Sequence, residues 1–138
     1  VTGRTDGLYR LEPTGPRLVR ADSRVLAAAQ AGFGQPPAPD TDSGLRHAVV
    51  VAVTSARVGD LLAEHGAAGL GLLNLACGWA SHGICLAAAR YDLAARPARS
   101  YDEHHLAPLL DLPPGELPVF LTACGRSRHI GLQLDLRP

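Results

Sequence analysis

The stretch GLLNLACGWASHGICLAAARYD, residues 71–92, decides the fold, because it is apolar over nearly the length of a membrane span yet contains several glycines, an Asn, a His and the single Trp. It could form a membrane helix, a buried core helix or part of a site. With the residues before it, its Ala and Leu content predicts one long helix over about 57–82. We expect the helix to end at His82-Gly83 and residues 84–92 to form a buried strand. A single membrane span would then have to cross a helix stop, so we expect none.

Gly66, Gly69 and Gly71 lie inside this expected helix, where each costs about 1 kcal/mol relative to Ala. The close approach of another helix is the simplest compensation, because a missing side chain lets two backbones come together. Trp79 is most simply explained by packing in the core or between subunits, with stacking near a ligand as the alternative. Asn74 needs partners for its amide, which could be backbone groups, another protomer or a ligand.

The rest of the chain alternates short strands, turns and helices. Alternating segments around EPTGP predict a β-hairpin over 7–20. Ser23 is expected to cap a helix over 24–32, and a capping box from Ser100 to Glu103 is expected to begin another. The remaining expectations are loops at 35–44 and 94–100, buried strands at 47–54 and 119–125, and a strictly alternating tail, 130–138, that needs a sheet edge to join.

The composition narrows the class of protein. The 138 residues are 46% hydrophobic and 19% charged, with a formal net charge of zero, so we expect one domain and no nucleic-acid partner. The three cysteines lie in apolar segments, which favours a reducing cytoplasm over a disulfide framework. The segment VTGRTDG at the N-terminus has no apolar stretch behind its charge, so we expect no signal peptide.

The element order β-β-α-β-α-β-α-β-β predicts an α+β or α/β sandwich with one long central helix. Three segments carry a resemblance by their order and spacing: GLYRLEPTGPRLVR (7–20), LLNLACGWASHGIC (72–85) and SYDEHHLAPLLDLPPGELPVFLTACGR (100–126). They resemble the C-terminal half of the nitroreductase family, and within it the SagB-type dehydrogenases, which include the azoline oxidases of peptide natural-product pathways. The resemblance covers roughly residues 7–128.

The resemblance implies an α+β, nitroreductase-like sandwich in which residues 1–138 are one partial domain completed by dimerisation. The partner would be a second copy or another nitroreductase-fold chain, with the tail 130–138 exchanged between them. The long helix would lie at the dimer centre, with FMN in clefts between protomers. The residues implied at the interface are Gly66, Gly69, Leu73, Asn74 and Trp79.

The implied activity is that of an FMN-dependent oxidoreductase acting on a peptide-derived or other natural-product substrate, in which the flavin accepts hydride and the protein positions it. Gly83-Ile84-Cys85 stands where the family has GLG, and Arg126 and Arg128 stand near its phosphate-binding residues. Both arginines could bind a phosphate through charge-assisted hydrogen bonds. The RRS-R and PS-G-P motifs of the family's N-terminal half do not occur in this sequence, so this chain alone is not expected to make a whole FMN site.

Other reactive side chains carry weaker signals. The resemblance places Tyr91 and Tyr101 near the cofactor mouth, where either could supply a substrate-side hydroxyl or simply lie on the surface. His104 and His105 are adjacent on an expected helix and point about 100° apart, so we expect no metal site there. Cys85 and Cys124 are expected in buried strands, where a free thiol behaves as a small hydrophobe.

Three functions are compatible with these sequence features. The chain could be a subunit of an FMN-dependent dehydrogenase or oxidase, completed by a partner chain. It could be a flavin-free relative that serves as a structural or assembly subunit. It could also be a ligand-binding or hydrolytic α/β domain unrelated to flavins.

Overall fold

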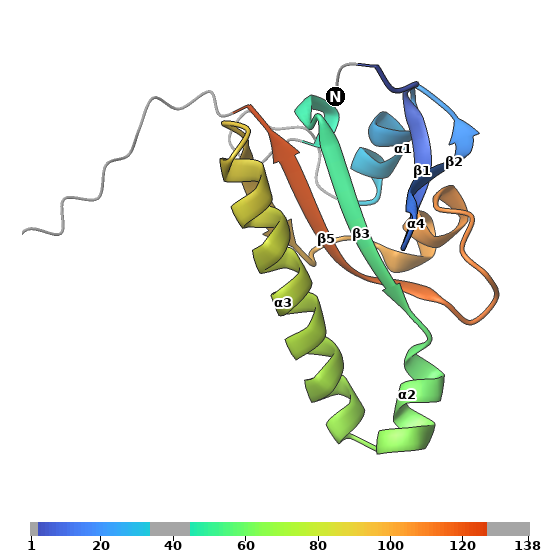
Figure 1. The fold of residues 1–138 in the computed structure, drawn as a ribbon. Helices are drawn as coiled ribbons and strands as arrows, with labels where there is room; N and C mark the ends of the chain where they lie inside the picture. Colours follow the sequence, from blue (N-terminus) through green and yellow to red (C-terminus); the bar gives the residue numbers. More distant parts are fainter. Residues whose placement is uncertain (1–2, 34–44, 127–138) are drawn as a thin grey trace, which may run out of the picture.

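A computed structural model describes residues 3–33 and 45–126, and the rest of the chain is drawn as a grey trace (Figure 1). The order of the elements is β1 (Gly7–Glu12), β2 (Gly15–Ala21), α1 (Val25–Ala31), a 3₁₀ turn (Leu45–His47), β3 (Val50–Ala56), α2 (Val58–His65), α3 (Ala68–Ala89), β4 (Ala94–Ala98), α4 (Glu103–Leu109) and β5 (Leu117–Gly125). The expected loop at 35–44 and the tail at 130–138 lie outside the described residues.

Strand β5 is the centre of a three-stranded antiparallel sheet with the order β3-β5-β4. Both neighbours align on the same residue of β5, since Ala52 of β3 and Pro97 of β4 each pair with Thr122. Residues 94–98, expected as a loop, therefore form a strand. The strand signal in these residues is poor because Pro97 cannot donate a ladder hydrogen bond, which an edge strand tolerates.

The two faces of the sheet carry different partners. Leu121 of β5 packs with Leu45 and Leu106 in the main hydrophobic core, beneath α1 and α4. The opposite face is covered by α3, which contacts β4 and β5. Figure 1 shows this arrangement, with α3 on one side of the sheet and α1, α4 and the β1–β2 hairpin on the other.

The hairpin forms as expected, whereas the caps of helices α1 and α4 differ from expectation. The hairpin is confirmed, with strands joined by a turn at Pro13-Thr14. Helix α1 is preceded by Arg24, whose backbone N–H donates to Asp22 Oδ1 at 2.9 Å, so Ser23 is not the cap. Helix α4 is capped by Asp102, whose carboxylate accepts from two backbone N–H groups, so the expected Ser100 capping box was wrong.

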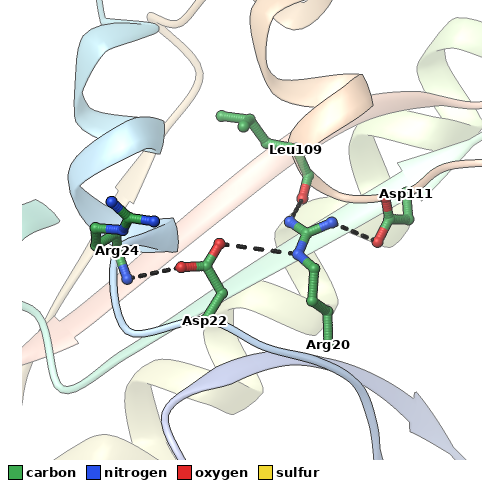
Figure 2. A network of polar contacts seen from close by, with 5 residues as sticks. All are labelled: Arg20, Asp22, Arg24, Leu109 and Asp111. Atoms are coloured by element: carbon green, nitrogen blue, oxygen red, sulfur yellow. Dashed lines mark hydrogen bonds and ion pairs between the residues drawn. The ribbon is translucent and has the colours of Figure 1, made fainter.

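A guanidinium group ties the hairpin to the C-terminal end of α4 (Figure 2). Arg20 donates to the Leu109 carbonyl at 2.8 Å and to Asp111 Oδ2 at 2.7 Å, and lies 3.8 Å from Asp22 Oδ2. The last carbonyls of a helix lack partners within the helix and are electronegative, so a cation is favourable there. Arg20 therefore docks the two-stranded sheet onto the body of the molecule.

The expected single helix over 57–82 is two helices. Gly66 adopts φ +58° and ψ −150° between α2 and α3, a conformation that only glycine adopts readily. Helix α3 then continues past His82-Gly83 to Ala89, so the strand expected over 84–92 was wrong. A single glycine costs about 1 kcal/mol in a helix, which packing against the sheet can offset. The true stop follows Arg90, where Asp92 has φ +54°.

Helix α3 is long and apolar enough to cross a membrane, judged by length and composition alone. Its 22 residues include no Asp, Glu, Lys or Arg, and 17% of its most apolar window is buried within this chain. The expected stop at His82-Gly83 was the reason for expecting no span, and that reason does not hold. The helix does use one face to pack on the sheet, and the described residues leave its other faces largely uncovered.

Candidate functional site

The sheet-facing side of α3 carries a buried polar contact. Ser81 and Thr122 of β5 are both buried, and their hydroxyl oxygens lie 2.9 Å apart. Cys77 and Ala88 flank Ser81 on the same face and are also buried. This pairing satisfies both hydroxyls within the protein, and it fixes how α3 sits along β5.

The opposite side of α3 is an exposed apolar stripe. Its large side chains recur at alternating spacings of three and four residues, so they line one face of the helix. We call this face the α3 stripe; it consists of Leu72, Leu75, Trp79, His82 and Leu86. Leu75 is 71% exposed and Trp79 is 82% exposed. An exposed stripe of this kind on a 22-residue helix is typical of a surface that binds another segment or molecule.

Glycines flank the α3 stripe. A Cβ added to Gly71, Gly78 or Gly83 would have no atom of the described residues, 3–33 and 45–126, within 4 Å. Small residues beside large apolar ones allow a second helix to approach closely. The sequence predicts a close neighbouring helix at Gly71, and no such neighbour lies in the described part of this chain.

Gly69 does have the predicted close helical neighbour, and it belongs to the same chain. A Cβ at this position would lie 2.7 Å from the Leu61 carbonyl oxygen of α2. Gly69 is therefore buried between the two helices. Gly66 provides the turn between them, and Leu73 is partly buried. The role of these residues at a subunit interface stays a prediction.

A polar cluster lies between the first half of α3 and the end of β4. Arg99 donates to Asn74 Oδ1 at 2.8 Å, so the exposed amide of Asn74 has a side-chain partner in its own chain. Burial raises the pKa of Cys77, and Arg99 opposes that shift by favouring the thiolate. Sequence reasoning missed Arg99, because nothing in the sequence links residues 25 positions apart.

Tyr101 is the member of this region with an unpaired polar atom. Its hydroxyl is buried without a hydrogen-bond partner among residues 3–33 and 45–126, while its ring packs edge-on against Phe33 at a centroid distance of 5.9 Å. Burial raises its pKa to about 12, with Arg99 opposing the shift and Glu103 adding to it. A buried hydroxyl without a partner in the chain is available to a ligand or to a second chain.

Tyr91 and Tyr101 are not brought together. Tyr91 is 78% exposed in the turn after α3, and Tyr101 precedes α4. The five residues of β4 separate the two, a span of about 17 Å at roughly 3.3 Å per residue. Of the two candidates for a substrate-side hydroxyl, Tyr101 is the one held in a defined environment.

The predicted flavin-binding residues have a different local structure from the expected one. Gly83, Ile84 and Cys85 lie inside α3, and not at a helix end followed by a strand as the sequence predicts. Backbone N–H groups in a helix interior donate to carbonyls of the preceding turn, so they are not free to bind a cofactor. Arg126 is exposed directly after β5, and Arg128 lies outside the described residues. Their contact with FMN stays a prediction.

His105, Cys85 and Cys124 lie where they contribute to packing or to contacts between elements. His105 contacts the Ala28 carbonyl through Nε2 at 3.0 Å and so links α4 to α1. Cys85 lies in a helix, which corrects the expected strand, and Cys124 is buried in β5 as expected. Within residues 3–33 and 45–126, no three His, Cys, Asp or Glu side chains are grouped to hold a metal ion.

We expect Tyr101→Phe to leave folding stability unchanged or raise it by up to about 1 kcal/mol, because the hydroxyl it removes is buried and unpaired. The raised pKa also predicts that wild-type stability is intact below pH 10 and falls as the pH rises through about 12, since the unfolded chain releases the phenolic proton first. Urea unfolding at pH 7 and at pH 11 would measure both effects. Tyr91→Phe is the matched control. A marked loss of stability in Tyr101→Phe at pH 7 would show that the hydroxyl has a partner.

Known structures with the same fold are crystal structures of proteins provisionally assigned as nitroreductases. One, from Ralstonia eutropha JMP134 at 2.00 Å resolution, has a TM-score of 0.68 and 21% sequence identity, over 90% of this chain and 55% of that one. Another, from Anabaena variabilis ATCC 29413 at 1.80 Å, has a TM-score of 0.63 and 20% identity, over 92% of this chain and 25% of that one. The sequence matches no protein-family model and no curated protein.

These similarities establish the fold. The chain has the nitroreductase fold, an α+β arrangement with a long central helix, and the expected fold class is confirmed. The chain spans about half the length of the first relative and a quarter of the second.

Proposed function

We propose that this chain is a subunit of an FMN-dependent oxidoreductase whose flavin site is completed by a second chain. The observation that carries the proposal is the exposed α3 stripe on a nitroreductase fold that covers 55% of one relative. Proteins of this fold are typically dimers, and the α3 stripe is an exposed apolar surface of the kind that forms subunit interfaces. The second chain is another copy or another chain of the same fold.

The described residues offer only part of a flavin site. Arg126 is an exposed cation that could bind a phosphate, and the unpaired Tyr101 hydroxyl could donate to a bound molecule. The helical conformation of residues 83–85 removes the backbone donors that a loop would supply. The remaining donors must therefore come from elsewhere, which supports completion by a partner and not a site within this chain.

When bound, FMN would supply the hydride chemistry. The residues of this chain would orient the reactants. Arg99 is held by its hydrogen bond to Asn74 and lies close enough to Tyr101 to affect its pKa. Trp79 offers an aromatic face on the surface where the partner would bind. In keeping with the SagB resemblance, we propose a peptide-derived or other natural-product substrate, with oxidation of a thiazoline or oxazoline ring as the reaction. The cytoplasm is the compartment that suits three free thiols.

A second function is favoured by a specific observation. Because Gly83, Ile84 and Cys85 are inside a helix, the chain could have lost flavin binding and kept only its packing surfaces. It would then be a structural or assembly subunit. The two functions differ in whether the assembled protein holds flavin.

The visible absorption spectrum distinguishes them. Purified protein, alone and mixed with FMN and with any nitroreductase-fold chain encoded beside it, is passed through gel filtration. We expect a flavin band to stay with the complex of both chains and to be weak or missing with this chain alone. Arg126→Gln should reduce the retained flavin by about tenfold if the arginine binds the phosphate, which corresponds to about 1.4 kcal/mol. A complex that forms without any flavin would support the assembly function instead.

A further inference from the structure

Helix α3 runs parallel to β5, and two polar contacts establish the direction. Near the start of α3, Asn74 accepts from Arg99, which directly follows β4 at the level where that strand pairs with Leu121 of β5. Further along α3, Ser81 contacts Thr122 at 2.9 Å. Both sequences therefore advance in the same direction.

This register brings two cysteines to the same level. After α3 the chain turns into β4, whose first residue pairs with Gly125, so the last turns of the helix lie beside the end of β5. Four residues along a helix advance about 6 Å, and two residues along a strand advance about 6.6 Å. One step beyond the contact of Ser81 with Thr122, the same register places Cys85 and Cys124 at one level, on the facing sides of the two elements.

The environment of the two thiols supports this placement. Burial raises the pKa of Cys124, and the proximity of Cys85 raises it further. Cys85 is partly exposed and Cys124 is buried, so an external reagent reaches Cys85 first. The third cysteine, Cys77, lies two turns earlier on α3, beside Arg99.

We propose that Cys85 and Cys124 form a redox-sensitive dithiol that a small disulfide compound, such as oxidised glutathione, converts to a disulfide. The Cys85 thiolate attacks one sulfur of the compound, forming a mixed disulfide and releasing one glutathione thiolate. The Cys124 thiolate then attacks the Cys85 sulfur and releases the second. The two protein thiols lose two electrons and two protons, and these reduce the compound to two thiols. The product covalently joins α3 to the central strand, and the reaction does not require a flavin.

The test uses the full chain, incubated with oxidised glutathione, alkylated under denaturing conditions and mapped by mass spectrometry. We expect a peptide pair linked through Cys85 and Cys124, a mass lower by about 2 Da for the two hydrogens lost, and normal alkylation of Cys77. Dithiothreitol should restore alkylation of all three cysteines. The oxidised protein should also unfold at a Tm higher by about 5–10 °C, because the disulfide closes a long loop.

Two variants make the result specific. Cys77→Ser should form the same cross-link and show the same Tm shift, since this residue is outside the pair. Cys85→Ser should form no intramolecular cross-link and show no shift. The proposal is overturned if all three thiols stay free after oxidation, if Cys77 is in the cross-link, or if the link joins two chains.

Discussion

The double substitution Leu75→Arg and Trp79→Arg is expected to convert the proposed dimer of this chain into a monomer. These side chains are the most exposed large hydrophobic residues of the α3 stripe, so our proposal places them at the centre of the subunit interface. In a two-fold interface each substitution occurs twice. The variant would bring four guanidinium groups into an apolar contact that offers them no partners, and burying unpaired charge is strongly unfavourable.

The expected effect is large. Fully burying one such side chain contributes roughly 1.5–3 kcal/mol, and the charges add a desolvation cost. We expect the dimer Kd to rise by at least about 1000-fold, which corresponds to about 4 kcal/mol. Sedimentation equilibrium over a range of concentrations measures this directly. Circular dichroism confirms that the variant is folded, since neither side chain packs against the sheet.

Leu11→Arg is the matched control, because Leu11 is 83% exposed on the β1–β2 hairpin and away from α3. It should leave the Kd within about threefold. A double variant that dimerises like the wild type would remove the α3 stripe from the interface. A wild-type protein that is monomeric and sediments with lipid vesicles through this stripe would instead identify a membrane surface as the partner of α3.

Gly69→Leu is expected to destabilise the fold by about 2–4 kcal/mol. A Cβ at this position would lie 2.7 Å from the Leu61 carbonyl oxygen, a backbone atom that cannot move away without shifting α2. The rest of the leucine side chain would increase the separation of the helices. Urea unfolding followed by circular dichroism, at a concentration where the wild-type oligomer is unchanged, gives the free energy of unfolding.

Gly71→Ala provides the control on the same helix. Nothing lies within 4 Å of a Cβ at that position, so the substitution should stabilise the protein by up to about 1 kcal/mol through helix propensity. The two variants are therefore expected to change stability in opposite directions. Equal destabilisation by both would mean that Gly71 also contacts a partner in the assembled protein, and no change in Gly69→Leu would mean that α2 does not pack against α3 in solution.

Local sequence signals predicted the hairpin, the strand that forms β5 and the existence of a long apolar helix. They failed where tertiary contacts outweigh propensity. Gly83 looked like a helix stop because it follows a His in an apolar run, but the helix continues through it to pack Ala88 against the sheet. Gly66 looked like one costly residue among several, but its positive φ is the feature that divides α2 from α3. Nothing local distinguishes these two glycines.

The candidate site was predicted less completely than the fold. The resemblance indicated Tyr101, and the structure holds it in a defined environment, but its raised pKa depends on burial by residues from several elements. Arg99 could be found only from three-dimensional proximity to Asn74. The α3 stripe could have been found from sequence, because Leu72, Trp79 and Leu86 repeat every seven residues; the apolar residues on the other faces of the helix obscured that period.

The central position of β5 has a consequence for synthesis of the chain. β5 comes after every other described element in sequence and pairs with both β3 and β4. β3 therefore stays unpaired until β5 is synthesised, and β5 begins about sixty residues after β3 ends. Strands so far apart in sequence pair slowly. Until β5 leaves the ribosome, α3 has no sheet to pack on, so its sheet-facing side is exposed together with the α3 stripe. The nascent chain thus passes through an aggregation-prone stage, during which chaperones would determine the yield of folded protein.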